Sequence, residues 1–585
     1  MQSHTKQGEC FVGKHSFQYR QKRTKRTPAF EQMSERKIKQ KKKPKKKQTF
    51  ACLHEDRKGE SQIQFSLFPQ HPNGIMKTMI KGLLSLIVFV AAQISNVKPE
   101  QDFYTAAVFE HARFGSRNDS AELIVRTNLD YYRRATEIAS SKGADVIVFP
   151  EYGIFSPGER DQLKDFLENI PDPKASRVNP CEESQLFSDR PILYTLSCMA
   201  KNNSIFVVAN TGDIKDCQGD PDCPEDGVFH FNTNVVMDRT GTLVVRYHKE
   251  HLFYEFGMDL ARGQQDTTFE TDFGTFATYI CFDLDYGRMS RVARQPSVDG
   301  VMFTTMWVEQ PPQMKSIQVW EAWSLANNST LLASNIQLPG LNAIGSGVFH
   351  GELGPLAYTF NPDGISKLVV AKVPRPGFDP VSPDSSITAI SETKTWDWED
   401  DGRDVGYECS TKVLGQATDI YTQYRCIEEN VTNYNFKELE GPSGHVEACD
   451  NDLCCSLDYA TTGLNNRFFL GAFSGLYNHF GRYSWYEEDC ILVRCDASED
   501  RPCSTFPMKS ETVFQQVLLK GNFTSEIVYP SVLESGMRLT PKSDWRYERP
   551  NQQEAFVQFN SDSGKNLITV GMKGRSYDKD PPYQR

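Results

Sequence analysis

The chain has 585 residues, 39% of them hydrophobic and 11% aromatic, which is enough apolar material for a sizeable core and for several domains. Its formal net charge of −11 conceals two unlike parts, because residues 1–75 hold 18 Lys and Arg against 6 Asp and Glu, whereas residues 96–585 hold 45 against 70. The acidic balance of the larger part argues against nucleic acid and anionic membrane surfaces, so we expect neither as a partner.

A lysine-rich segment opens the chain. Residues 1–75 are expected to be disordered, because the like charges around the lysine run at 41–47 repel one another and cannot bury apolar surface. The competing interpretation is a nuclear-localisation or nucleic-acid patch in a nuclear basic protein, and it depends on this segment alone.

Residues 76–95 have the pattern of a secretory signal peptide. Met76 opens a basic stretch, an apolar run of about eleven residues covers 82–92, and small residues follow at a suitable cleavage point. A membrane span needs about 20 apolar residues, so this run is too short to favour one. We therefore expect translation to start at Met76 or Met79, residues 1–75 to be an untranslated upstream extension, and the mature chain to be secreted.

Glycosylation sequons are typical of a secreted protein. We expect candidate glycosylation sites at six asparagines, of which the third and fourth overlap and are not both expected to be modified: Asn118, Asn202, Asn327, Asn328, Asn430 and Asn522.

Cysteine usage points to the same compartment. Of 15 cysteines, two fall in residues 1–75 and Cys281 is a candidate nucleophile, which leaves four in 181–223 and eight in 409–503. This even number is expected to pair in disulfides, although four cysteines allow three pairings and eight allow 105. Zinc is the rival use, but no Cys-x-x-Cys pair with matching histidines is present, so no metal site is expected.

The first folded domain is expected at about residues 100–375 and alternates strands with helices. A 3.6-residue spacing of apolar positions predicts a helix at 121–141, stopped by Gly143. A turn at Asp238–Gly241 predicts a hairpin between 234–237 and 242–247, and Asn361–Gly364 predicts another before a strand at 367–373. Further strands are predicted at 104–110, 144–149, 204–210, 276–281, 300–305 and 330–336, and a further helix at 319–327. This alternation predicts a layered α/β domain.

A second domain follows a change in composition. Residues 376–404 are rich in Pro, Ser, Asp and Thr without periodicity and are expected to be a linker. Residues 405–585 place short apolar stretches among Gly, Asn and Cys, which predicts a smaller, disulfide-rich β domain.

Three motifs carry the chemistry. Glu151, Lys249 and Cys281 each end an apolar, β-branched run, and they supply a base, a cation for a developing oxyanion and a nucleophile. Taken singly, each has an ordinary explanation: a turn carboxylate, a solvated lysine and a small buried hydrophobic residue. Together they are the groups needed to cleave an amide through a thioester.

The order and spacing of these residues resemble the nitrilase (carbon–nitrogen hydrolase) superfamily, and within it the vanin and biotinidase branch, from about Asp102 to near the C-terminus. The resemblance implies a four-layer αββα sandwich and a catalytic triad without metal or cofactor. It further implies that Glu255 orients the lysine or the substrate amide and that the backbone amide of Phe282 is an oxyanion donor. The adjacent cysteines in Leu453–Leu457 resemble those of the vanin C-terminal domain.

The resemblance also implies a function. We expect a secreted amidase acting on a small linear amide, by resemblance pantetheine, which would yield pantothenate and cysteamine. Hydrolysis of biotinyl-lysine is the alternative within the family, and a catalytically silent secreted glycoprotein on the same scaffold is the alternative outside catalysis. The polar end of the chain, unlike the anchored mammalian vanins, predicts no membrane anchor, and we expect a monomer.

Overall fold

The computed structural model describes residues 102–116, 118–375, 384–390, 428–479, 481–497, 502–503 and 506–583. The expectations for residues 1–95 lie outside this part of the chain, as do Cys409 and Cys426. The described residues belong to one compact unit, which spans Val97–Arg585.

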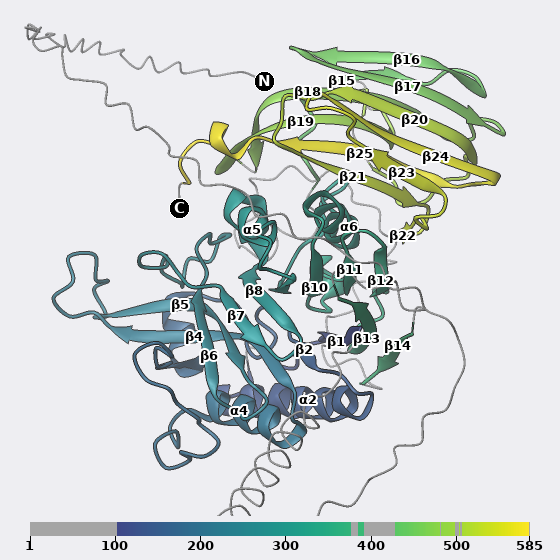
Figure 1. Cartoon of the computed structure of the whole chain (residues 1–585). Coiled ribbons are helices and arrows are strands. Elements are labelled where there is room, and N and C mark those ends of the chain that lie inside the picture. The colour runs from purple at the N-terminus through teal and green to yellow at the C-terminus, as the bar shows by residue number, and fades with distance from the viewer. Residues whose placement is uncertain are drawn as a thin grey trace, which may run out of the picture. The chain divides into compact units, whose positions relative to one another are not determined.

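The first sheet of the N-terminal domain has eight strands in the order β14-β13-β1-β2-β4-β5-β6, with the short β3 beside β4 (Figure 1). Its strands are β1 (Phe103–Glu110), β2 (Val146–Val148), β3 (Leu167–Glu168), β4 (Phe206–Asp216), β5 (Val228–Met237), β6 (Leu243–His248), β13 (Lys367–Pro374) and β14 (Ser385–Ala389). The helices α2 (Ala121–Ser141), α3 (Arg160–Leu163) and α4 (Pro191–Asn203) belong to the same half of the domain.

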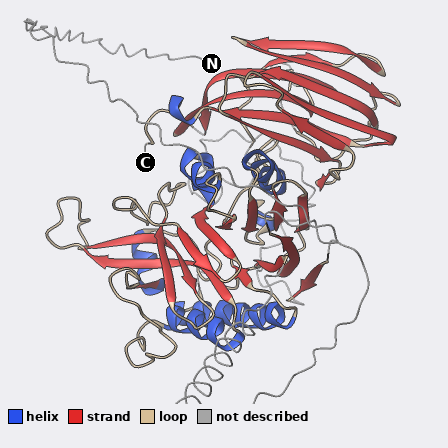
Figure 2. Cartoon of the chain, in the orientation of Figure 1, coloured by secondary structure: helices blue, strands red, loops and turns tan. Residues whose placement is uncertain are grey.

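The second sheet has six strands in the order β12-β11-β10-β9-β8-β7. They are β7 (Thr268–Thr271), β8 (Gly274–Ile280), β9 (Gly300–Thr304), β10 (Thr330–Ser334), β11 (Ser346–His350) and β12 (Gly354–Thr359). The helices α5 (Gly287–Ala293) and α6 (Ser316–Asn327) complete this half. Figure 2 shows the two groups of helices on opposite sides of the strands.

Strand alternation explains how the layers pack. On β2, Val146 and Val148 join a core shared with Ile280 and Val301 of the second sheet. Ile147 points the other way, into a core that includes residues of α2 and α4. Both faces of the first sheet are therefore buried, and the layered α/β domain expected from the sequence is confirmed as helices, sheet, sheet, helices.

Some of the secondary-structure predictions are confirmed by the structure and others are not. The helix at 121–141 is confirmed, with the side chain of Ser120 accepting a hydrogen bond from the backbone amide of Leu123 as its cap. The hairpin around Asp238 is also confirmed. The second predicted hairpin is wrong, because β12 pairs with β11 whereas β13 pairs with β1 and β14, so the turn joins strands of different sheets. Strand β14 falls inside the range expected to be a linker.

The C-terminal domain is a sandwich of two antiparallel sheets around a core of its own. One sheet has the order β15-β18-β19-β25-β21-β22, and the other has the order β16-β17-β20-β24-β23. The strands are β15 (Asn435–Glu438), β16 (Ser443–Asp450), β17 (Leu453–Thr461), β18 (Phe468–His479), β19 (Tyr483–Arg494), β20 (Phe514–Asn522), β21 (Ile527–Glu534), β22 (Arg538–Leu539), β23 (Trp545–Glu548), β24 (Glu554–Lys565) and β25 (Leu567–Arg575).

The two domains share a hydrophobic core. Trp323 of α6 and Trp485 of β19 belong to one cluster of buried residues. Ser290 of α5 lies 3.2 Å from the hydroxyl of Tyr529 on β21. The first sheet of the sandwich therefore packs onto the helices that cover the second sheet of the N-terminal domain.

Disulfides staple both domains, as the cysteine count predicted. The described pairs are Cys181–Cys198, Cys217–Cys223, Cys449–Cys454, Cys455–Cys490 and Cys495–Cys503. Within the described part of the chain, Cys281 is the one cysteine without a disulfide partner, and it is buried.

Candidate active site

The three predicted catalytic residues lie near the ends of three strands. Glu151 follows β2 by three residues, Lys249 comes directly after β6, and Cys281 directly after β8. Their exposed fractions are 2%, 2% and 7%. Because β2 and β6 belong to one sheet and β8 to the sheet that faces it, the site lies between the two sheets at their strand ends.

Lys249 and Asn232 together hold two carboxylates. The Lys249 ammonium donates to Glu151 Oε1 at 2.7 Å and to Glu255 Oε2 at 2.6 Å. The Asn232 amide donates to Glu151 Oε1 at 2.8 Å and to Glu255 Oε1 at 2.5 Å. The second oxygen of Glu151 accepts from the backbone amide of Met306 at 2.9 Å. The structure therefore brings Glu255 into a single hydrogen-bonded network with Glu151 and Lys249.

The buried charges shift one another's proton affinities. Burial raises the pKa of Glu151, and the neighbouring Glu255 raises it further, against the opposing charge of Lys249. Burial alone would lower the pKa of Lys249, but the charges of Glu151, Glu255 and Cys281 outweigh it and raise that pKa well above its usual range. The ammonium is thus charged, and the carboxyl group of Glu151 holds a proton more readily than an ordinary glutamate does.

Cys281 is kept as a thiol in the resting site. Burial raises the pKa of Cys281 well above its usual range, and the negative charge of Glu151 adds to this effect more than Lys249 offsets it. A nucleophilic cysteine needs either a lowered pKa or a base that takes its proton. This arrangement provides the second solution, because the carboxyl group of Glu151 belongs to the same cluster of charges.

The backbone is held in unusual conformations at the same place. Tyr152, Tyr254 and Cys281 have φ angles of 52°, 53° and 43°, in the left-handed region that non-glycine residues seldom adopt. The first follows Glu151 and the second precedes Glu255. Such conformations persist where the surroundings hold them, and they cluster at functional sites.

Asp283 joins the nucleophile turn to the lysine loop. One of its oxygens accepts from the Ile280 amide at 3.0 Å and from the Tyr247 hydroxyl at 2.7 Å. The other accepts from the backbone amide and the Nδ1 of His251, at 3.0 and 2.9 Å. His251 therefore connects the loop after Lys249 to the turn that carries Cys281.

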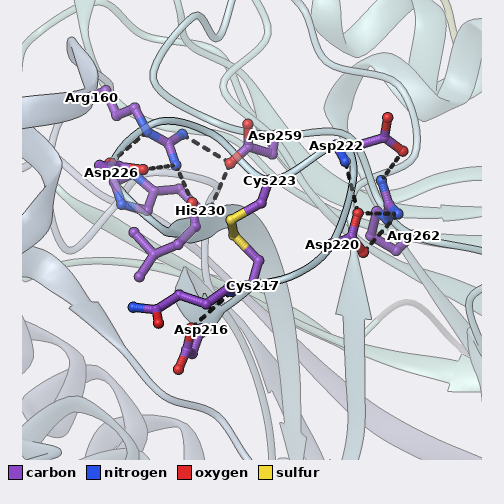
Figure 3. Close-up of a disulfide and its surroundings, with 12 residues drawn as sticks. Arg160, Asp216, Cys217, Asp220, Asp222, Cys223, Asp226, His230, Asp259 and Arg262 are labelled. Atoms are coloured by element: carbon purple, nitrogen blue, oxygen red, sulfur yellow. Dashed lines mark hydrogen bonds and ion pairs between the residues drawn. A yellow bond between two sulfur atoms is a disulfide. The ribbon is translucent and has the colours of Figure 1, made fainter.

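The segment after Glu255 is anchored next to a disulfide loop (Figure 3). The Asp259 carboxylate accepts from the His230 amide at 2.8 Å and from the Arg160 guanidinium at 2.8 Å. Beside it, Arg262 pairs with Asp220 and Asp222 of the loop that Cys217–Cys223 closes. These contacts hold the end of the Glu255 loop against the start of β5, the strand that carries Asn232.

Sequence reasoning missed Asn232, Tyr152 and Asp283. The hydroxyl of Tyr152 donates to Glu255 Oε1 at 2.7 Å. A signal for Asn232 was present, because His230, Asn232 and Asn234 alternate along a buried strand whose other residues, apart from Thr233, are apolar. Buried polar side chains at every second position indicate a polar site on one face of that strand.

The sequons differ in accessibility. Asn327 is 4% exposed, and its amide donates to the Trp323 carbonyl at 2.9 Å. In the folded chain, the amide nitrogen of Asn327 that would carry a glycan is therefore buried in helix α6. Asn328, the overlapping candidate, is exposed, and so are Asn118, Asn202, Asn430 and Asn522.

The described residues contain no cluster of His, Cys, Asp and Glu suited to a metal ion. Among the same residues, no helix is long and apolar enough to cross a membrane.

Comparisons with known proteins cover both domains. Residues 117–324 match the carbon-nitrogen hydrolase family, and residues 424–580 match the vanin C-terminal domain. The chain is 32% identical to a human pantetheinase over 519 residues, which are 86% of this chain and 94% of that protein. It is 33% identical to a bovine biotinidase over 505 residues, covering 82% and 93% of the two chains. A solved amidase from Nesterenkonia sp. is 19% identical, with a TM-score of 0.34, and covers 48% of this chain and 93% of its own.

Proposed function

The chain belongs to the carbon–nitrogen hydrolase family and carries a vanin C-terminal domain, and we propose that it is a secreted amidase that hydrolyses pantetheine to pantothenate and cysteamine. The enzyme class, a carbon–nitrogen hydrolase of the vanin family, follows from the family itself. One observation supports the chemistry most directly: Lys249 bridges Glu151 and Glu255, and these charges act on Cys281. Among the described residues, Cys281 is the only cysteine outside a disulfide.

In the proposed first half-reaction, the Cys281 sulfur attacks the amide carbonyl carbon while Glu151 takes the thiol proton. Negative charge develops on the carbonyl oxygen, where the Lys249 ammonium and the Phe282 backbone amide would stabilise it. Collapse of the tetrahedral intermediate breaks the carbon–nitrogen bond. Glu151 returns the proton to the departing amine, and the acyl group stays on Cys281 as a thioester.

In the second half-reaction, Glu151 takes a proton from water, whose oxygen attacks the thioester carbonyl. The same oxyanion donors stabilise the second tetrahedral intermediate. Its collapse releases the carboxylic acid and returns the proton to the Cys281 sulfur, which restores the resting thiol. Glu255 would keep the ammonium in place throughout, since its carboxylate accepts a hydrogen bond from Lys249 Nζ.

The choice of pantetheine over biotinyl-lysine rests on relatives alone. The human pantetheinase and the bovine biotinidase are equally similar to this chain, at 32% and 33% identity, so cleavage of biotinyl-lysine is the second candidate. Secretion is supported by the disulfides in both domains, since such bonds persist in oxidising compartments. We further propose that the enzyme acts as a monomer without a metal or a cofactor.

The test expresses the chain from Met76 in a secreting host and measures amine release from pantetheine and from a biotinyl amide. A Cys281→Ala variant is the matched control, because it removes only the sulfur. Pantetheine turnover that disappears in this variant supports the proposal. Turnover of the biotinyl amide alone assigns the second function, and turnover that survives in the variant contradicts the role of Cys281. N-terminal sequencing of the secreted protein tests cleavage near residue 95.

A further inference from the structure

The C-terminal domain reaches the loop that connects Lys249 with Glu255. The hydroxyl of Tyr483, the first residue of β19, donates to the Leu252 carbonyl at 3.2 Å and accepts from the Tyr254 amide at 3.0 Å. The hydroxyl of Tyr583 donates to the same Leu252 carbonyl at 2.7 Å. Two tyrosines that lie more than two hundred residues away in the sequence therefore hold the backbone of this loop.

The same domain contacts the turn that carries the nucleophile. The Tyr483 ring lies 4.8 Å from the ring of Phe282, the residue after Cys281, and 5.6 Å from that of Phe253. Arg575 of β25 donates to the carbonyl of Asp285, the last residue of the same turn, at 2.8 Å. Tyr483 is thus a single side chain in contact with both active-site segments.

The hydrogen bond to Tyr254 falls at the strained point of the loop. Tyr254 has a left-handed backbone, which a non-glycine residue keeps only where its surroundings hold it. The next residue is Glu255, whose carboxylate contacts Lys249 Nζ and Asn232 Nδ2 at 2.6 and 2.5 Å. Relaxation at Tyr254 would therefore move the carboxylate that holds the ammonium.

We propose that Tyr483, assisted by Tyr583, is a positioning residue of the active site, so that the C-terminal domain completes the catalytic geometry of the N-terminal one. This inference depends on the proposed roles of Lys249, Glu255 and Cys281. The tyrosine hydroxyls touch only the backbone of the loop in the described structure, and they act on the reaction through Glu255 and Lys249. Small displacements of this kind reduce turnover far more than they reduce stability.

The test uses Tyr483→Phe and Tyr583→Phe, which remove one hydroxyl each and keep the packed rings. Tyr459→Phe is the matched control, because that hydroxyl also donates to a backbone carbonyl, of Glu440 at 2.8 Å, but within the C-terminal domain. The full secreted chain is used throughout, with kcat, KM and Tm measured for each variant.

We expect Tyr483→Phe to lower kcat about ten-fold or more with little change in KM, and its Tm to match that of Tyr459→Phe. Tyr583→Phe should give a smaller fall in the same direction, since it removes one hydrogen bond rather than two. A kcat for Tyr483→Phe within about two-fold of that of Tyr459→Phe overturns the inference. If Tyr483→Phe fails to fold, an unchanged kcat in Tyr583→Phe overturns it equally.

Failure of this inference is distinguishable from failure of the proposed function. Wild-type protein and Cys281→Ala are assayed beside the tyrosine variants. An inactive wild-type protein, or an active Cys281→Ala variant, contradicts the function itself. An active wild-type protein with an inactive Cys281→Ala variant and an unaffected Tyr483→Phe variant contradicts the positioning role alone.

Discussion

Neutralising Glu255 should make Glu151 a stronger acid. In a Glu255→Gln variant, the side chain keeps its size and can still accept hydrogen bonds, but one of the two negative charges around Lys249 disappears. Glu255 is one of the groups that raise the pKa of Glu151, so that pKa falls when the charge is removed. Glu151 must be deprotonated to take the thiol proton, and activity therefore rises as pH passes through its pKa. The acid limb of the pH profile should move to lower pH.

The size of the shift in the pKa of Glu151 follows from the distance between the two carboxylates that contact Lys249. The two carboxylate oxygens that accept from Lys249 Nζ lie 2.7 and 2.6 Å from it, so they are roughly 4–5 Å from each other. Two like charges at that separation repel by about 3–4 kcal/mol at an effective dielectric constant of about 20. Because 1.4 kcal/mol corresponds to about one pKa unit, about three units is the upper bound, and we expect a shift of about one to two units. Turnover at the optimum should also fall, because the ammonium loses one of its two anionic contacts.

The assay is the pH dependence of kcat/KM between about pH 4 and pH 9, for which the acid limb reports the free enzyme. Glu250→Gln is the matched control, because Glu250 lies in the same loop but pairs with Arg288. An acid limb that stays in place in Glu255→Gln, or moves to higher pH, refutes the reasoning. An equal shift in Glu250→Gln would show that the loop's net charge, and not the contact with Lys249, is responsible.

Three further outcomes are expected. Asn232→Ala should lower kcat about 100-fold and destabilise the fold by about 1–3 kcal/mol, because the carboxylates of Glu151 and Glu255 lose a buried hydrogen-bond donor. Unchanged kinetics and an unchanged denaturation midpoint would contradict this prediction. Burial raises the pKa of Glu321 to about 8, so the wild-type fold loses stability as pH rises through that value. Glu321→Gln should therefore raise Tm by an amount that increases from about pH 5 to pH 9. A difference in Tm that does not depend on pH would contradict this prediction. Replacing Cys455 and Cys490 by Ala should cost roughly 4 kcal/mol, since their disulfide spans 35 residues; a Tm equal to that of wild type would contradict it.

The sequence predicted those parts of the site that depend on local pattern. Glu151, Lys249 and Cys281 each end an apolar, β-branched run, but they could be identified as a set only because their order and spacing resemble those of the nitrilase superfamily. The helix at 121–141 was equally predictable, since its periodicity, its cap and its stop are local features. The second hairpin was not, because turn residues specify a reversal of the chain and not the sheet that the next strand joins.

The other residues of the site could not be predicted, because their positions depend on tertiary contacts between distant segments. Asn232 is a functional residue only because β5 lies beside β6 and brings its amide to two carboxylates from other segments. Asp283 has four hydrogen bonds, two of them from a loop that is more than thirty residues away. Tyr483 belongs to a different domain. The spacing of residues along the sequence does not predict these contacts between distant segments, although the alternation of polar residues along β5 indicates that one face of that strand is functional.

The raised pKa of Cys281 explains how this cysteine can stay free while the other cysteines of the described residues form disulfides. Thiol–disulfide exchange requires the thiolate, and burial beside Glu151 keeps Cys281 protonated. A cysteine activated in advance, by a lowered pKa, would be exposed to oxidation in the extracellular space that we propose for this enzyme. In the mechanism that we propose, the proton is removed only when Glu151 acts as the base, so that reactivity arises within the geometry that Lys249 and Glu255 maintain. In the same proposed mechanism, Glu151 keeps the thiol protonated at rest and takes its proton once an amide carbonyl is in place.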